Sequence, residues 1–250
     1  NAFTGIFDGQ NKENQENYKI SNLYINYEND TVLNYYGFGR SIGLFAKGNT
    51  QDTTIKNLEV SGEIKGAGHT GSIIGENAKL IENCINHANI IGYNMVGGIA
   101  GYNIESIKNS ENYGEVNITG RSYAYGGVGG IIGTGISVEN CINEGNIFSN
   151  SAAVGGIMGH NENLTKIDYC KNYGNITLNG SSYGATAGGI LGVNNLKVEI
   201  KNSCNQGTII VKETSEVPGG IVGMSAGNSY ESELILSIYN SFNTGEVISE

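Results

Sequence analysis

The chain is built from short apolar segments separated by glycine and asparagine, and the same three segments recur in a fixed order. The first reads Gly-Ile-apolar-Gly, as in Val96–Gly101, the second reads Ile-x-Asn-Cys, as in Ile81–Cys84, and the third reads Asn-x-Gly-x-Val, as in Asn112–Val116. The isoleucines that mark the first segment are Ile73, Ile99, Ile131, Ile157, Ile190 and Ile221, at intervals of 26, 32, 26, 33 and 31 residues. A repeat of this period is typical of a solenoid, a propeller or an array.

Each segment has the composition of a short β-strand. Val, Ile, Tyr and Thr favour strands, no apolar pattern of period 3.6 is present, and glycine at this density would cost a helix roughly 1 kcal/mol at each site. A propeller blade needs roughly 40 to 45 residues, which the cycles of 26 residues cannot supply. The sequence therefore predicts an all-β parallel β-helix of about seven or eight coils, with three short strands per coil and a first coil that begins at Ile20–Asn22.

Alignment of the cycles produces two columns of asparagine. The column in the second segment contains Asn22, Asn57, Asn83, Asn109, Asn140, Asn202 and Asn240, and is interrupted by Tyr169. The column that opens the third segment contains Asn86, Asn112, Asn143, Asn172, Asn205 and Asn243. Asparagine tolerates the left-handed conformation of a sharp bend, and stacked amides can hydrogen-bond along the axis. We expect structural ladders at both columns, and we expect the glycines of the third segment to meet a need for an unusual backbone angle or for no side chain.

Three of the four cysteines occupy one column of the repeat. Cys84, Cys141 and Cys170 share this position with leucine or serine in other coils, a restriction that predicts buried thiols. A disulfide between Cys141 and Cys170, on successive coils, is the alternative. Cys204 lies one position later, in a column of mixed charged and apolar residues, and we expect it to face outward.

Two adjacent columns of the first segment are both apolar, those of Ile99 and Ala100. Strand alternation would turn one of them outward. Either the chain bends between them, which we favour, or one face carries an apolar stripe that packs against another domain or chain.

Composition and charge restrict the class of protein further. The 250 residues include 39 glycines, one proline and no tryptophan, and the repeat runs almost from end to end, so we expect one domain over residues 1–250. The net charge of -10 disfavours nucleic acid and anionic membranes as partners, and no apolar window is long enough for membrane insertion. Both ends of the sequence look cut from something longer.

The three segments, together with the opening Phe3–Gly9, resemble the GLUG repeat of bacterial surface proteins. That repeat occurs in adhesin-like proteins and in the amino-terminal region of immunoglobulin-A-cleaving zinc peptidases. The resemblance covers nearly the whole chain and implies a right-handed parallel β-helix in a secreted or wall-attached protein. The His-Glu-x-x-His signature of the peptidase is absent, so its catalytic residues have no counterpart in this sequence.

The sequence offers few residues for chemistry. His69, His87 and His160 lack the spacing of a zinc site and are interpreted as surface residues. Because parallel β-helices also include glycan-degrading enzymes that use clustered carboxylates, Glu139 and Asp168 on neighbouring coils are the best candidates for such a pair. Their column also holds lysine in other coils, which is typical of a solvated face. We predict no catalytic residue, no metal site and no cofactor.

Binding is the remaining function. The longer cycles carry extra residues after the third segment, and these insertions contain the candidate ligand contacts Arg121, Tyr123, Tyr125 and Tyr183. Insertions at one place in the cycle often form a binding face, and Tyr-rich and Gly-rich loops suit a host protein or a glycan, although tolerated surface loops would have the same position. We expect a non-catalytic extracellular stalk or adhesion module. The alternatives are an accessory domain that presents substrate to a peptidase and, third, a carbohydrate-active enzyme.

Overall fold

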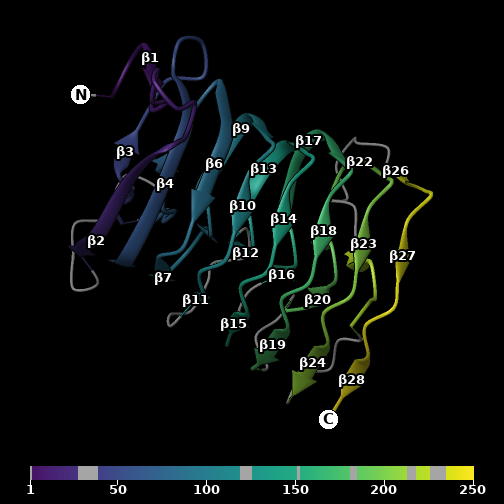
Figure 1. Cartoon of the computed structure of the whole chain (residues 1–250). Coiled ribbons are helices and arrows are strands. Elements are labelled where there is room, and N and C mark those ends of the chain that lie inside the picture. The colour runs from purple at the N-terminus through teal and green to yellow at the C-terminus, as the bar shows by residue number, and fades with distance from the viewer. Residues whose placement is uncertain are drawn as a thin grey trace.

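The computed structural model describes residues 2–27, 39–118, 126–150, 153–180, 185–212, 218–225 and 235–250. These residues form the predicted parallel β-helix, in which successive coils stack from the purple amino-terminal end to the yellow carboxyl-terminal end of Figure 1. Every pairing between the named strands of the described ranges is parallel, and no helix occurs in them. Consequently none of these residues belongs to a helix that could cross a membrane.

The strands fall into stacks that correspond to the segments of the repeat. The first segment forms β3 (Phe45–Lys47), β5 (Ile74–Glu76), the first half of β9 (Ala100–Lys108), β13 (Ile132–Glu139) and β17 (Met158–Asp168), then β21 (Leu191–Asn194) and β25 (Val222–Ser225). The second forms β1 (Ile6–Asp8), β4 (Thr54–Lys65), β6 (Leu80–Asn86), the second halves of β9, β13 and β17, then β22 (Lys197–Lys201) and β26 (Ile235–Tyr239). The short strands β10 (Glu111–Asn112), β14 (Ile142–Asn143), β18 (Lys171–Asn172), β23 (Cys204–Asn205) and β27 (Phe242–Asn243) follow it. The third forms β2 (Tyr18–Asn26), β7 (Asn89–Gly92), β11 (Val116–Ile118), β15 (Ile147–Ser149), β19 (Ile176–Asn179), β24 (Ile209–Lys212) and β28 (Val247–Ser249).

The strand register confirms the columns that the repeat predicts. Ile81 lies opposite Ile55 and Ile107, and the same pairing continues through every later copy of the second segment. The third-segment asparagines also pair with one another, from Asn86 to Asn243. Like residues therefore lie on adjacent rungs along one axis.

A bend in the first segment accounts for its two neighbouring apolar columns. Ile99 and Ala100 are both fully buried, as are their counterparts Ile157 and Met158. A further stack of short strands precedes the bend: β8 (Val96–Gly97), β12 (Gly127–Gly129), β16 (Ala153–Gly155) and β20 (Ala187–Gly188). The chain turns at Gly98 and Ile99, between β8 and β9, so both side chains face the interior. The predicted bend is confirmed. The strands that precede it form an additional stack that the three segments did not predict.

The asparagines of the second segment adopt the left-handed backbone conformation. Asn57, Asn83, Asn109, Asn140, Asn202 and Asn240 have φ between 47° and 59°. Asn22 has a φ of 58° as well, but it lies at the register shift between Ile20 and Leu23 and not in this column. Tyr169, which interrupts this column, has a φ of 52°, a conformation that bulky side chains rarely adopt. The bend therefore belongs to the coil as a whole, and asparagine is among the residues other than glycine that adopt it at least cost.

The start of the first coil was predicted wrongly. The structure aligns Phe7, not Ile20, with Ile55 of the next coil, and it places Ile20 opposite Val60 and Leu23 opposite Gly62. The loop Gln10–Asn17, closed by an antiparallel bridge between its ends, is inserted within this coil. Tyr18 resumes the coil, because its N–H donates to the carbonyl of Gly9 at 2.6 Å. The insertion hides the relation of Phe3–Gly9 to the later copies.

The column cysteines are buried and unbonded. Cys84, Cys141 and Cys170 are fully buried free thiols, so the disulfide alternative is not realised. Burial raises the pKa of Cys84 and that of Cys170 to about 12. Cys204 was expected to face outward and therefore to be exposed, but it is only 6% exposed. Cys204 lies between Lys171 and Phe242 on the adjacent rungs, and these longer side chains can cover it.

The third-segment asparagines form a continuous buried ladder. Each Nδ2 donates to the Oδ1 of the asparagine on the next coil, from Asn86 to Asn112 at 2.7 Å and onward to Asn243, with distances between 2.6 and 2.8 Å. Each Nδ2 also donates to the carbonyl two residues ahead in its own chain, as Asn143 does to Gly145 at 2.9 Å. The predicted ladder is confirmed, and it satisfies polar groups that have no access to water.

Glycine is required beside this ladder because the backbones approach closely. A Cβ added at Gly145 would lie 1.9 Å from the carbonyl oxygen of Gly114, and one added at Gly130 would lie 2.2 Å from Cγ of Asn143. Neither glycine has a positive φ. Of the two expected reasons for glycine in the third segment, the need for no side chain is therefore the correct one.

Candidate ligand-binding surface

The insertions that carry the candidate contacts leave the coils at one place. Arg121, Tyr123, Tyr125 and Tyr183 lie outside the described residues, but the strands that flank them do not. Residues 119–125 follow β11, residues 181–184 follow β19 and residues 213–217 follow β24. Because β7, β11, β15, β19 and β24 are stacked in register, the insertions begin at the same edge of this sheet. The shared position that the repeat predicts is confirmed.

A hollow lies on the outer face of this same sheet, across β11, β15 and β19. We call it the Phe148 hollow, and its outward-facing residues are Asn117, Phe148, Asn150, Thr177 and Asn179. Asn117, Phe148 and Thr177 are direct neighbours in the strand register. The Phe148 side chain is 38% exposed, and the hollow has a volume of about 430 Å³. The repeat did not predict this site, although the alternation of Ile147 inward and Phe148 outward was a usable signal.

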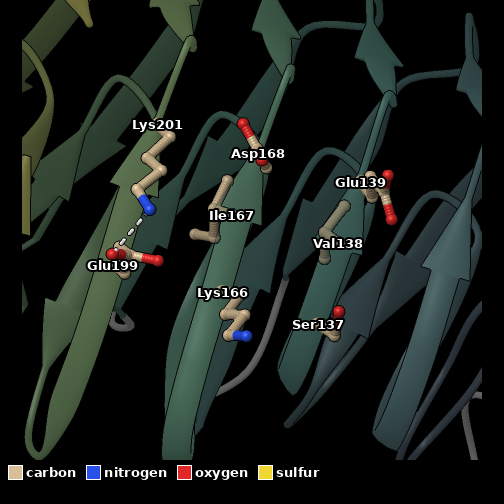
Figure 2. Close-up of a pocket in the computed structure, with 8 residues that line it drawn as sticks. All are labelled: Ser137, Val138, Glu139, Lys166, Ile167, Asp168, Glu199 and Lys201. Carbon is tan, nitrogen blue, oxygen red and sulfur yellow. Dashed lines mark ion pairs between the residues drawn. The ribbon is translucent and has the colours of Figure 1, made fainter. Parts of the chain in front are cut away.

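The two candidate catalytic carboxylates line a different hollow, shown in Figure 2. Glu139 and Asp168 are register neighbours on β13 and β17, as predicted from the repeat. Each carboxylate has a partner on the side away from the other. Lys108, on the preceding coil, places its Nζ 2.7 Å from Glu139 Oε2, and Asn202, on the following coil, donates from Nδ2 to Asp168 Oδ1 at 2.9 Å.

The rest of the lining of this second hollow includes one ion pair. Lys201 stands beside Asp168 in the register and forms an ion pair of 2.8 Å with Glu199, drawn as the dashed line in Figure 2. Lys166 lies between Ser137 and Glu199 on the adjacent rungs. Alternating acidic and basic side chains that turn toward separate partners are typical of a solvated face.

The interpretation of all three histidines as surface residues is wrong for two of them. His69 is 8% exposed and His160 is 5% exposed. His87 is exposed, and its ring stacks on that of Tyr113 with centroids 5.0 Å apart. The sequence around His69 and His160 resembles a loop, which suggested exposure. Neighbouring coils cover both side chains, and the local sequence does not indicate that burial.

His160 belongs to a buried polar group at a corner of the solenoid. Its Nε2 lies 2.6 Å from Nδ2 of Asn195, a contact in which a neutral ring acts as acceptor. Nearby, Asn161 donates to Asn194 at 3.0 Å, and Asn194 donates to Ser225 at 3.0 Å, so a third ladder runs here that the repeat did not predict. Burial lowers the pKa of His160 from 6.5 to about 4.

This burial leads to a prediction for acid stability. Between pH 6.5 and 4 the unfolded chain binds a proton at His160 that the folded chain does not bind, so the free energy of unfolding should fall by roughly 3 kcal/mol as the pH decreases across this interval. The variant His160→Gln should lose this part of the pH dependence, as measured by urea unfolding at several pH values. Parallel decreases in the variant and the parent protein would contradict the assignment.

The amino-terminal end holds a partly buried ionisable group, Glu76. Its carboxylate accepts from Ser41 Oγ at 2.7 Å, lies 2.7 Å from Lys47 Nζ and lies 3.7 Å from Nδ1 of His69. The His69 ring, followed by Lys47 and Ser41, lowers the pKa of Glu76 to about 2 against the opposing effect of partial burial. A carboxylate with this pKa stays ionised near neutral pH and is poorly suited to general acid–base catalysis. Its contacts join three separate stretches of the first coils.

Metal ligands do not gather in the described ranges. No group of three or more His, Cys, Asp or Glu side chains there could hold a metal ion. The arrangement that remains is a parallel β-helix with one neutral hollow beside a row of insertions. It is the geometry of an elongated scaffold.

Comparison with known proteins extends the description of the fold. The sequence matches no family model and no curated protein. The structure is similar to the crystal structure of a "putative immunoglobulin A1 protease" from Bacteroides ovatus, with a TM-score of 0.54 and 20% sequence identity. The match covers 94% of this chain and 66% of that chain. At this identity the similarity concerns the fold.

Proposed function

We propose that this chain is a non-catalytic stalk and interaction module of an extracellular bacterial protein. The observation that carries the proposal is the position of the insertions, which all begin at one edge of a continuous in-register solenoid, beside the Phe148 hollow. Solenoids commonly present ligands along such an extended edge. The GLUG-like segments support placement in a secreted or wall-attached protein with neighbouring domains.

The carboxylates and histidines of the described coils favour binding over catalysis. Glu139 and Asp168 turn to partners on opposite sides, and Glu76 is held as an anion by three neighbours. His160 is neutral and enclosed. A hydrolytic pair would instead need two carboxyl groups that converge on one substrate bond.

A second candidate function is an accessory domain that presents substrate to a peptidase. The fold similarity to the Bacteroides ovatus protein supports this candidate, since almost all of this chain takes part in the match. In that case the partner of the lateral surface would be an immunoglobulin.

An array of immobilised glycans and host proteins, including immunoglobulin A, tests both candidates. We expect the chain to bind at least one probe, and the double variant Tyr123→Ala/Tyr125→Ala to bind it at least tenfold more weakly. Tyr239→Ala is the matched control, because Tyr239 is exposed on β26, in a different stack, and should change binding less than twofold.

Selective capture of immunoglobulin A would favour the accessory domain. Binding to no probe would contradict both candidates. Release of unsaturated sugars from any glycan would show an enzyme and overturn the proposal.

A further inference from the structure

The Phe148 hollow combines one aromatic surface with uncharged hydrogen-bonding groups. The ring of Phe148 is flanked in the register by Asn117 on one side and Thr177 on the other, and the amides of Asn150 and Asn179 lie at the strand ends. None of the described residues that line the hollow is charged. Its volume of about 430 Å³ belongs to an open, shallow depression, so a ligand bound there would keep one face in solvent.

The chemistry of these groups matches that of a sugar ring. A pyranose has an apolar face of C–H groups and a rim of hydroxyls. The C–H face can lie on the negative face of an aromatic ring, and hydroxyls, which both donate and accept, pair with amides and hydroxyls that do the same.

The absence of charge among the described lining residues favours neutral over anionic glycans. The hollow offers no cation among its described lining residues, and the chain as a whole carries a net charge of -10. Sialylated or sulfated glycans would therefore meet repulsion without a compensating ion pair. A neutral glycan meets none.

A protein partner fits this surface less well. Phe148 is the one aromatic side chain of this part of its outward column, because Asn117 and Thr177 flank it and the half-buried Ile91 and Ile210 lie one rung beyond them. Stable protein interfaces bury roughly 800 Å² on each partner around a packed apolar centre. A single aromatic ring among amides has the scale of one or two sugar units instead.

We propose that the Phe148 hollow is a binding site for a neutral glycan, with Phe148 as the stacking platform and Asn117, Thr177 and Asn179 as hydrogen-bonding groups. This inference rests on the proposed function and names the class of its ligand.

Calorimetry with lactose, N-acetyllactosamine and mannobiose, and with 3'-sialyllactose as the charged comparison, tests the proposal. We expect at least one neutral sugar to bind, and Phe148→Ala to weaken it at least tenfold. Thr177→Val keeps the strand preference, removes the hydroxyl and should weaken binding severalfold. Phe242→Ala is the control, since Phe242 is another exposed outward phenylalanine, on β27, and should change affinity less than twofold.

A spectroscopic variant provides an independent measurement. The chain contains no tryptophan, so Phe148→Trp introduces a single indole at the proposed platform. Its fluorescence should shift on titration with the neutral sugar and should not respond to 3'-sialyllactose. Because position 148 faces outward, thermal unfolding of each variant should match that of the parent protein.

The outcomes separate this inference from the proposed function. If the chain binds host proteins but none of these neutral sugars, the inference fails and the function stands. The same holds if Tyr123→Ala/Tyr125→Ala abolishes binding while Phe148→Ala has no effect, or if 3'-sialyllactose binds more tightly than the neutral sugars. If nothing binds, both fail.

Discussion

Replacement of Asn143 by alanine is expected to lower the free energy of unfolding by about 4 kcal/mol. Asn143 is fully buried and makes three hydrogen bonds: it accepts from Asn112 and donates to Asn172 and to the carbonyl of Gly145. Alanine removes the donor from Asn172 Oδ1 and from the Gly145 carbonyl inside the core, while Asn112 Nδ2 keeps only its bond to the Gly114 carbonyl. Each unsatisfied group costs about 1 to 3 kcal/mol. Urea unfolding followed by circular dichroism measures the difference.

Asn243→Ala is the matched control at the carboxyl-terminal end of the same ladder. Asn243 is partly exposed, and it accepts from Asn205 and donates to Gly245. With fewer bonds and access to water, its loss should cost less than half as much. Equal effects of the two substitutions would mean that the ladder does not act through buried hydrogen bonds.

Replacement of Gly145 by alanine is expected to cost at least about 3 kcal/mol or to prevent folding. The added methyl group would lie 1.9 Å from the carbonyl oxygen of Gly114 on the preceding coil. Backbone atoms form this contact, so it cannot be relieved by a side-chain rotation. The coils would have to move apart and would lengthen the hydrogen bonds on both sides. Thermal and urea unfolding, together with soluble yield, measure the effect.

Gly5→Ala separates a steric effect from a conformational one. Gly5 has a φ of 112°, but a Cβ placed there would meet no atom within 4 Å. Its substitution should cost only about 1 to 2 kcal/mol of backbone strain. If Gly145→Ala were no more destabilising than Gly5→Ala, close stacking of the turns would not explain the glycine column.

Much of the fold follows from the sequence because every coil repeats the same physical problem. A column that holds Asn112, Asn143 and Asn172 at one position, with glycine two residues later, indicates that this position is the same place on successive rungs. The register and the buried ladder confirm this interpretation. The left-handed second column follows from the known preference of asparagine, and even Tyr169 conforms to it.

The remaining features depend on what one coil places over another. The loop Gln10–Asn17 interrupts the first coil, so the match at Ile20–Asn22 was stronger in the sequence than the true match at Phe7. His160 and Cys204 are buried by neighbours from other coils, which a column alone does not reveal. The Phe148 hollow arises from the side chains of three strands, and no single segment of the sequence contains it. The predicted contacts Arg121, Tyr123, Tyr125 and Tyr183 lie outside the described residues and stay predictions.

The close approach of Gly130 and Asn143 restricts how the number of coils can change during evolution. Both residues belong to one cycle, and the same partnership recurs between Gly156 and Asn172 and between Gly189 and Asn205. Gene duplication or deletion of one full cycle would carry the glycine and its asparagine together and leave no mismatched neighbour at the junction. Loss of a partial cycle would place a side chain where only a hydrogen atom fits. The number of coils should therefore change by whole turns, while the insertions after the third segment can change in length independently.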